Sequence, residues 1–311
     1  TNGTTLMTAI GALQVYDAEL ILNSANCAAA LSLEAQNGTM RAYSPQIHAS
    51  RPQAMQAETA ASLRDLLAGS ELTRPDTSTN VQDAYTLRCV PQVHGAVHSA
   101  VTYAHGVVET ELNSVTDNPL LFFDESGEVT ILSGGNFHGE PLALALDFLS
   151  IALTDLGNMS ERRIAKLIDN HPEHYPSFLA AQGGLNSGFM LLQYTAAALC
   201  SENKTLAHPD SVDTIPSSGN VEDHVSMGAN AALHCRQIVE NVRTIIAIEL
   251  MSACQALDFR LQEKPVLKLG QGTAKAYREV RAAVPFFEHD AYFKPGMDAV
   301  IELVRQGRFC S

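Results

Sequence analysis

The sequence contains no tryptophan, and aromatic residues make up only 6% of its 311 positions. Aliphatic side chains and alanine must therefore fill the interior. Positive charge is also scarce, because 20 Lys and Arg stand against 34 Asp and Glu, for a net charge of -14. A phosphate backbone would be repelled by such a chain, which argues against a nucleic-acid partner. No basic segment leads into an apolar run at the start, so no secretory signal is predicted.

The six cysteines lack CxxC pairs and the spacing of a metal site. This pattern predicts buried free thiols in a reducing compartment, and we expect a cytoplasmic location. The chain begins at Thr1 without a methionine. We therefore expect a processed or partial polypeptide.

A long apolar segment predicts the first helix. Between Thr5 and Leu33 the only charged residues are Asp17 and Glu19, and apolar residues cover most of the helix circumference. Such a helix is buried, and its polar residues argue against a membrane partner. At roughly 30 residues it would be about 45 Å long, which implies an extended bundle.

The remaining periodicity is also mostly helical. Helices are predicted over about 91–116, 140–168, 188–207 and 222–256, with shorter ones near 272–284 and 296–306. Residues 120–123 and 129–132 flank a turn and predict one hairpin. Because there is no internal repeat or low-complexity linker, the sequence predicts a single all-α domain over 1–311, a long-helix bundle with a minor β-hairpin.

Three polar side chains precede the second long helix. Gln82, Tyr85 and Arg88 are spaced to share one face of a helical turn. An arginine fork binds a carboxylate through two parallel hydrogen bonds, and a neighbouring phenol can bind the ligand or move a proton. The alternative is a surface turn whose arginine caps a helix.

Two loops hold the other unusual side chains. The segment 133–140 combines paired glycines with Phe137, and either a tight turn or close approach of a ligand explains it. The segment 216–224 ends in Glu222, Asp223 and His224. Two carboxylates at a helix start favour its dipole, although acids beside an imidazole also suit acid/base chemistry.

Three histidines could suggest a metal. His94, His98 and His105 lie on roughly one helical face, but the Glu-x-x-His pairs of di-iron bundles do not occur. We therefore predict no metal site and expect these side chains in the core or between helices.

Five motifs carry a family resemblance when they are taken in order. They are Asn2-Gly3-Thr4, the segment 82–95, Ser114 to Pro119, Ser133 to His138, and Glu222 to Met227. Together they resemble the aromatic amino-acid ammonia-lyases that depend on 4-methylideneimidazol-5-one (MIO), and in particular the histidine ammonia-lyases. The resemblance covers essentially the whole chain.

The resemblance implies a fold and a reaction. The fold would be part of a fumarase/aspartase-like helical core assembled as a homotetramer. The reaction would be non-oxidative elimination of ammonia from an aromatic L-amino acid, foremost L-histidine to trans-urocanate. Phenylalanine or tyrosine ammonia-lyase and 2,3-aminomutase activities are the alternatives.

The resemblance also implies roles for particular residues. Arg88 would bind the substrate carboxylate and Phe137 would shape the pocket. Glu222 would face the substrate ring or its amine, where a carboxylate suits an imidazole. The full implied set has Tyr85 and Glu222 as catalytic residues and Asn2, Gln82, Arg88 and Phe137 as substrate-binding residues.

Two departures from the family pattern matter. No Ala-Ser-Gly, the source of MIO, occurs in the sequence, so we expect the prosthetic group from an N-terminal part of the same enzyme outside this chain. The segment with the usual tyrosine base is also missing. The second departure is Val221, which stands where the family commonly has Gln and bears on the choice of substrate.

Three rival interpretations remain. The fumarase/aspartase group shares a Ser-rich loop, but its Met-Pro-x-Lys-x-Asn continuation is absent. A chain without the prosthetic group could instead be a non-catalytic structural partner. An N-terminal nucleophile at Thr1 would lack an obvious supporting base.

Overall fold

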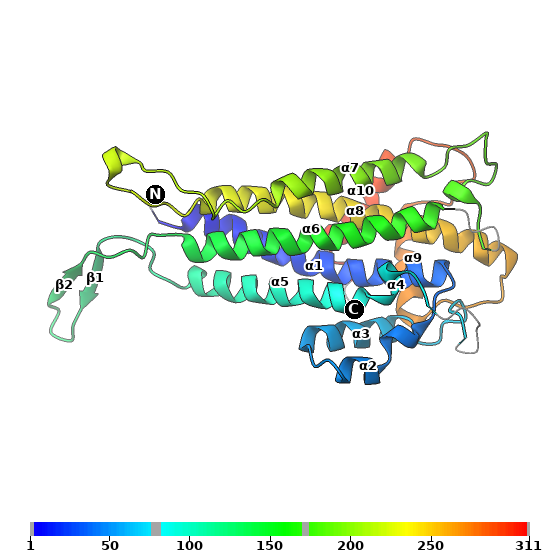
Figure 1. The fold of residues 1–311 in the computed structure, drawn as a ribbon, viewed down its shortest axis with the longest axis horizontal. Coiled ribbons are helices and arrows are strands. Elements are labelled where there is room, and N and C mark those ends of the chain that lie inside the picture. Colours follow the sequence, from blue (N-terminus) through cyan, green and yellow to red (C-terminus); the bar gives the residue numbers. More distant parts are fainter. Residues whose placement is uncertain (1–2, 76–81, 170–173, 310–311) are drawn as a thin grey trace.

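Long helices run side by side along one axis in the computed structural model (Figure 1). The structure describes residues 3–75, 82–169 and 174–309. The helices are α1 (Thr5–Ala35), α2 (Pro45–Ala49), α3 (Ala54–Leu66), α4 (Tyr85–Arg88), α5 (Val90–Leu112), α6 (Glu140–Ile168), α7 (Met190–Leu206), α8 (Gly228–Glu263), α9 (Gln271–Ala283) and α10 (Lys294–Arg305). Strands β1 (Leu120–Phe123) and β2 (Val129–Leu132) pair antiparallel.

Helix α8 is the centre of the core, where it packs along α1 and α6. Alanine makes this close packing possible, and α1 carries the fully buried run 28–30. Leucines of α6 and the isoleucines and valines of α8 fill the space between the helices. A core without tryptophan is thus built from small and aliphatic side chains, as the composition predicts.

A glycine sets the contact between α3 and α5. A Cβ added at Gly95 would lie 2.6 Å from the Cα of Gln56 and 2.7 Å from its backbone nitrogen. Only a residue without a side chain allows the two backbones to approach this closely. The contact fixes α3 against the N-terminal half of α5, next to α4.

One ion pair is completely buried in the bundle. Arg163 on α6 donates from Nε and Nη2 to the two carboxylate oxygens of Glu249 on α8, at 2.6 and 2.9 Å. Each oxygen also accepts a hydroxyl, from Ser32 at 2.7 Å and from Ser160 at 2.6 Å. The pair therefore joins α1, α6 and α8 with every strong acceptor satisfied.

Most predicted elements are present, and the hairpin has the predicted bounds. The predicted helix over 222–256 is wrong at its start, because α8 begins at Gly228. Met227 has a left-handed φ of 55°, and an antiparallel bridge joins Ser217 to Glu222. Glu222, Asp223 and His224 therefore lie in a loop before the helix rather than at its first turn. Helices α2 and α3 were not predicted.

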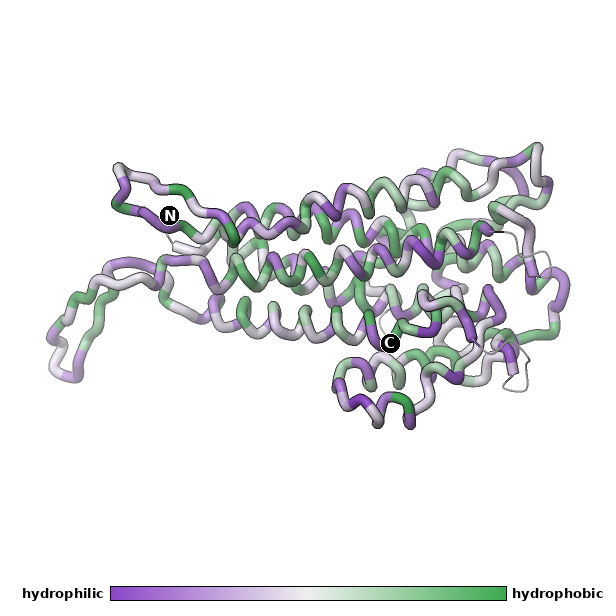
Figure 2. The backbone as a smooth tube through the Cα atoms, viewed as in Figure 1, coloured by the Kyte–Doolittle hydropathy of each residue, from purple (hydrophilic) through white to green (hydrophobic). Residues whose placement is uncertain are grey.

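Within a single chain, the first helix is enclosed all round only in its C-terminal half. Leu6 and Leu13 are each 64% exposed and Tyr16 is 60% exposed, whereas the C-terminal half is enclosed. Helices α1 and α6 are long and apolar enough to cross a membrane by length and composition alone, a test that buried core helices also pass. Figure 2 shows apolar segments along these helices and on the β1–β2 hairpin.

The buried thiols give a testable property of the core. Burial raises the pKa of Cys235 and of Cys254 to about 12. Because the thiolate is the reactive form, neither should react with iodoacetamide at pH 8 in the native protein. Peptide mass spectrometry should find both labelled only after unfolding, while half-buried Cys89 serves as the comparison. Rapid native labelling of both would contradict this packing.

Candidate active site

The turn that carries Arg88 is anchored on its N-terminal side by Asp83. One carboxylate oxygen of Asp83 accepts the backbone N–H of Thr39 at 2.7 Å. The other accepts from Nη2 of Arg74 at 2.7 Å, in an ion pair that is largely shielded from solvent. Gln82 lies immediately before this anchor and before α4, so α4 does not include it.

Two side chains donate hydrogen bonds to backbone carbonyls of α4. The hydroxyl of Tyr43 donates to the carbonyl of Leu87 at 2.9 Å, and burial raises the pKa of this phenol, which keeps it a donor. Nη1 of Arg163 donates to the carbonyl of Thr86 at 3.3 Å. The buried ion pair of the core thus reaches the turn that presents Tyr85 and Arg88.

The guanidinium of Arg88 lies over the ring of Tyr85, with 4.7 Å between its central carbon and the ring centroid. Its Nε is buried and has no hydrogen-bond partner among the described residues. Arg88 lines a cavity of about 490 Å³ together with Gln82, Asp83, Arg41 and residues of the segment 39–47. An arginine with an unused donor beside a cavity is suited to an anionic ligand.

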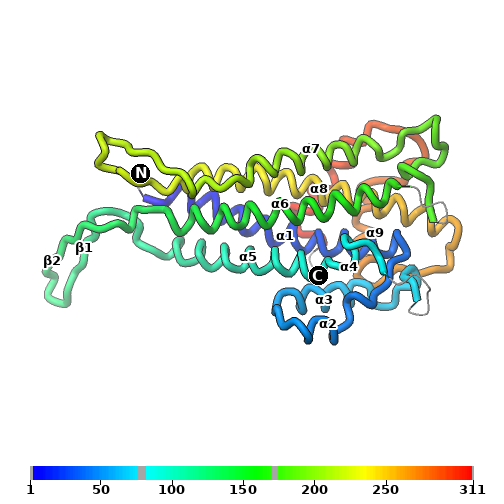
Figure 3. Tube along the Cα trace, in the orientation of Figure 1, coloured from blue at the N-terminus to red at the C-terminus, as the bar shows by residue number. Residues whose placement is uncertain are grey.

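The second group of predicted residues lies where α1, α6 and α8 all begin (Figure 3). The side-chain oxygen of Asn118 accepts the backbone N–H of Gly134 at 2.8 Å and the hydroxyl of Ser133 at 3.1 Å, which shapes the loop before Phe137. Phe137 itself is 38% exposed. Because three helix N-termini meet here, their free N–H groups contribute positive partial charge at this end of the bundle.

Glu222 belongs to the same end. It lies in an exposed loop, and the backbone N–H of Ser217 donates to its carbonyl at 2.9 Å. A hydrogen bond from Ser218 lowers the pKa of the Glu222 carboxyl. The side chain is therefore an ionised carboxylate at neutral pH, available to a cationic or hydrogen-bond-donating group.

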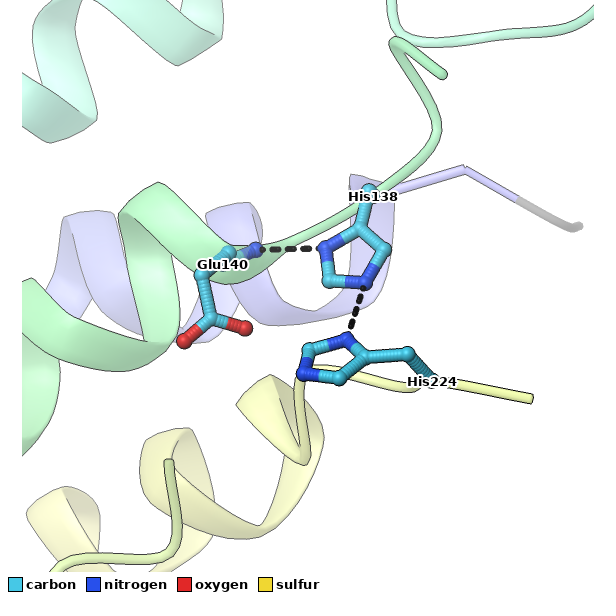
Figure 4. A group of neighbouring side chains, drawn as sticks. All are labelled: His138, Glu140 and His224. Atoms are coloured by element: carbon cyan, nitrogen blue, oxygen red, sulfur yellow. Dashed lines mark hydrogen bonds between the residues drawn. The ribbon is translucent and has the colours of Figure 1, made fainter. Parts of the chain in front are cut away.

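A histidine pair joins the loops of Phe137 and Glu222 (Figure 4). Nε2 of His138 lies 3.2 Å from Nδ1 of His224, and the rings stack with centroids 5.3 Å apart. The backbone N–H of Glu140 donates to Nδ1 of His138 at 3.3 Å. Ring nitrogens of the two histidines and a carboxylate oxygen of Glu140 lie within 4.8 Å of one another, close enough for a metal ion to be considered.

One chain does not bring the two groups together. Arg88 ends α4, two residues before the start of α5, whereas Asn136 donates to the carbonyl of Val115 just beyond the end of α5. The 23 residues of α5 span about 34 Å, so the Arg88 turn and the Phe137 loop are separated by roughly that length. Asn2 lies outside the described residues.

Two of the three histidines considered as metal ligands, His94 and His105, form contacts between helices. Nδ1 of His94 lies 2.7 Å from the side-chain oxygen of Asn26 on α1, and burial with the nearby Arg163 charge keeps the pKa of His94 well below its usual value. His105 pairs with Glu19 of α1 at 2.8 Å. Both contacts match the predicted inter-helix role.

Sequence reasoning missed the residues that support the site. Tyr43, Asp83 and Arg163 contact the α4 turn from distant parts of the chain, and no local pattern marks them. Arg41, in the same cavity as Arg88, was also missed. Among the supporting residues, only Glu140 has a local sequence signal. It directly follows His138-Gly139 and is the first residue of a helix.

Comparison with known proteins identifies the family. A family model described as aromatic amino acid lyase matches residues 1–282. The chain belongs to the aromatic amino acid lyase family. It is 53% identical over 314 residues to the histidine ammonia-lyase of Chloroflexus aurantiacus, in a match that covers 100% of this chain and 60% of that protein. The chain thus spans about 60% of the length of this curated relative.

Solved structures of aromatic amino acid lyases and aminomutases share the fold. The histidine ammonia-lyase from Trypanosoma cruzi matches with a TM-score of 0.89 and 44% identity, covering 99% of this chain and 57% of that one. The tyrosine aminomutase from Streptomyces globisporus matches with a TM-score of 0.90 and 36% identity, covering 99% and 61%. The all-α expectation and the family resemblance are confirmed.

Proposed function

We propose that this chain is the larger, C-terminal part of a carbon–nitrogen lyase that eliminates ammonia from L-histidine to give trans-urocanate. The observation that carries the proposal is the Arg88 guanidinium, held over Tyr85 with an unused Nε at the edge of a cavity. The identity to histidine ammonia-lyases supports the choice of histidine. A cytoplasmic location stays a prediction from the cysteine pattern.

Different residues of this chain bind different parts of the substrate. Elimination breaks the β-carbon–hydrogen and α-carbon–nitrogen bonds, forms a carbon–carbon double bond and releases ammonia. Arg88 binds the substrate carboxylate bidentately, with Gln82 and Tyr85 beside it. Phe137 packs against the substrate, and the ionised Glu222 accepts a hydrogen bond from its imidazole or ammonium group.

The chain also fits the prosthetic group that the family implies. MIO would supply an electrophile that makes the substrate amine a better leaving group. The positive ends of α1, α6 and α8 suit an electron-withdrawing group of this kind. By the family resemblance, Asn2 and Tyr85 are the residues of this chain that would lie near it, while Ala-Ser-Gly and the tyrosine base would come from the N-terminal part.

Assembly into a homotetramer is part of the proposal. The Arg88 turn and the Phe137 loop are about 34 Å apart, which exceeds the length of any amino-acid substrate, so a complete site needs both groups from different copies. Exposed apolar stripes at helical spacing support this association. They include Leu6, Leu13 and Tyr16 on α1 and Leu144, Phe148 and Ile151 on α6.

A test requires the complete assembly, made from this chain and the Ala-Ser-Gly-bearing part. Incubated with histidine, phenylalanine and tyrosine, it should release urocanate and ammonia from histidine at the highest kcat/KM. Borohydride or cyanide should abolish the activity by attacking the electrophile. Release of no unsaturated acid from any of the three would refute the proposal and favour a structural role.

A 2,3-aminomutase is the second candidate, because the Streptomyces globisporus tyrosine aminomutase shares the fold at a TM-score of 0.90. An aminomutase returns ammonia to the β-carbon, so its product is a β-amino acid. Chiral chromatography of the reaction mixture separates the two outcomes. Val221, which is exposed beside Glu222, is a position where a Val→Gln variant would test the effect on substrate choice.

A further inference from the structure

The contact between His138 and His224 fixes which ring nitrogens carry protons. The backbone N–H of Glu140 donates to Nδ1 of His138, so this nitrogen is an acceptor and the proton of a neutral ring is on Nε2. That Nε2–H then donates to Nδ1 of His224 at 3.2 Å. In the neutral ring of His224 the proton is consequently on Nε2.

The remaining donor points toward an acceptor that lacks a partner. Figure 4 shows the second nitrogen of His224 on the side of the Glu140 carboxylate. Oε2 of Glu140 is buried and has no hydrogen-bond partner among the described residues. The contacts therefore link the Glu140 backbone to His138 and His138 to His224, and the second nitrogen of His224 lies on the side of the unpartnered Glu140 carboxylate oxygen.

These tautomers do not suit a metal ion, although the ligand atoms lie within 4.8 Å of one another. A metal on Nε2 of His138 would need that nitrogen free of its proton. The proton would then move to Nδ1 and remove the acceptor of the Glu140 N–H, which has no helical partner at the first position of α6. The hydrogen-bonded arrangement satisfies the Glu140 N–H, both ring nitrogens of His138 and Nδ1 of His224.

The pair connects the two loops that carry substrate-facing residues. His138 directly follows Phe137, and His224 is two residues after Glu222. We propose that His138, His224 and Glu140 are positioning residues that lock the Phe137 loop to the Glu222 loop and so fix where these two side chains meet the substrate. This inference rests on the proposed function, in which Phe137 and Glu222 belong to one site.

Variants of the complete assembly test the lock. His138→Leu and His224→Leu should each lower kcat for L-histidine about 10-fold, the equivalent of one lost hydrogen bond, with little change in KM because Arg88 is untouched. The double variant should be no slower than either single variant, since both break the same contact. His224→Asn should stay within about 3-fold of wild type, because its side-chain oxygen can replace Nδ1 as the acceptor.

Two further measurements separate this lock from a metal site. Glu140→Gln keeps an acceptor oxygen and should stay within about 3-fold of wild type, and a chelator should have no effect. His98→Leu, whose ring lines a separate cavity between α1, α3 and α5, is the matched control and should leave kcat unchanged. Loss of activity on chelation together with an inactive Glu140→Gln variant would show that these three residues bind a metal ion, and it would overturn the proposed lock.

Hydrogen exchange distinguishes failure of the lock from failure of the proposed function. If the wild-type assembly turned over no amino acid, the lyase assignment would fail, but His224→Leu should still accelerate amide exchange across 133–139 and 217–226. Additive losses of kcat in the double variant, or unchanged exchange in both loops, would overturn the lock.

Discussion

Replacing Arg88 with lysine should raise the KM for L-histidine about 10- to 100-fold in the complete assembly. A charge-assisted hydrogen bond contributes about 1.5–3 kcal/mol, and an ammonium cannot reproduce two parallel bonds to a carboxylate. Lysine also loses the stacking of the guanidinium on Tyr85, where the two groups are 4.7 Å apart. Steady-state kinetics with L-histidine measure the effect.

The control for this substitution is Arg305→Lys. Arg305 lies on α10, half-exposed and paired with Glu240 and Glu302, so its replacement should leave KM unchanged. A substrate analogue without the carboxylate should bind the Arg88→Lys variant and the wild-type enzyme equally. An Arg88→Lys enzyme with unchanged KM for L-histidine would remove Arg88 from the carboxylate-binding role.

Replacing Arg163 with methionine should cost about 3–5 kcal/mol of the free energy of unfolding. The substitution leaves Glu249 as an unpaired charge in a site where both side chains are fully buried. It also removes the donor to the Thr86 carbonyl, so the α4 turn should lose part of its support. Urea denaturation followed by circular dichroism measures the loss of stability.

Two comparisons make this result interpretable. Arg305→Met breaks exposed ion pairs and should cost less than about 1 kcal/mol. The double variant Arg163→Met/Glu249→Leu removes both charges and should recover a large part of the loss, because no uncompensated charge remains. A loss below 1 kcal/mol for Arg163→Met alone would mean that Glu249 is neutralised in another way.

The sequence predicts the parts of the fold that depend on local patterns. Two apolar segments that flank a polar turn predict the β1–β2 hairpin, and the periodic spacing of apolar residues predicts the long helices. The start of α8 could not be predicted in this way, because the left-handed φ of Met227 has no signature in a methionine. Helix α3 was missed because its buried face includes Gln56 and Thr59.

Neighbouring arginines show why the supporting residues could not be predicted. Arg162 and Arg163 are identical and adjacent, yet the first is exposed and pairs with Glu161 while the second is fully buried against Glu249. The difference depends on which side of α6 faces α8, a property of the tertiary structure. In contrast, Arg88 and Glu222 could be proposed from motifs, although their separation within one chain could not.

Helix α5 separates the two groups of site residues by about 34 Å, and this distance has a genetic consequence in the proposed assembly. Each chain contributes its Arg88 end to one site and its Glu222 end to another. Two inactive chains, one defective at Arg88 and the other at Glu222, would therefore complement each other in a mixed tetramer. Some of its sites would receive both defects, while others would receive only the two intact halves.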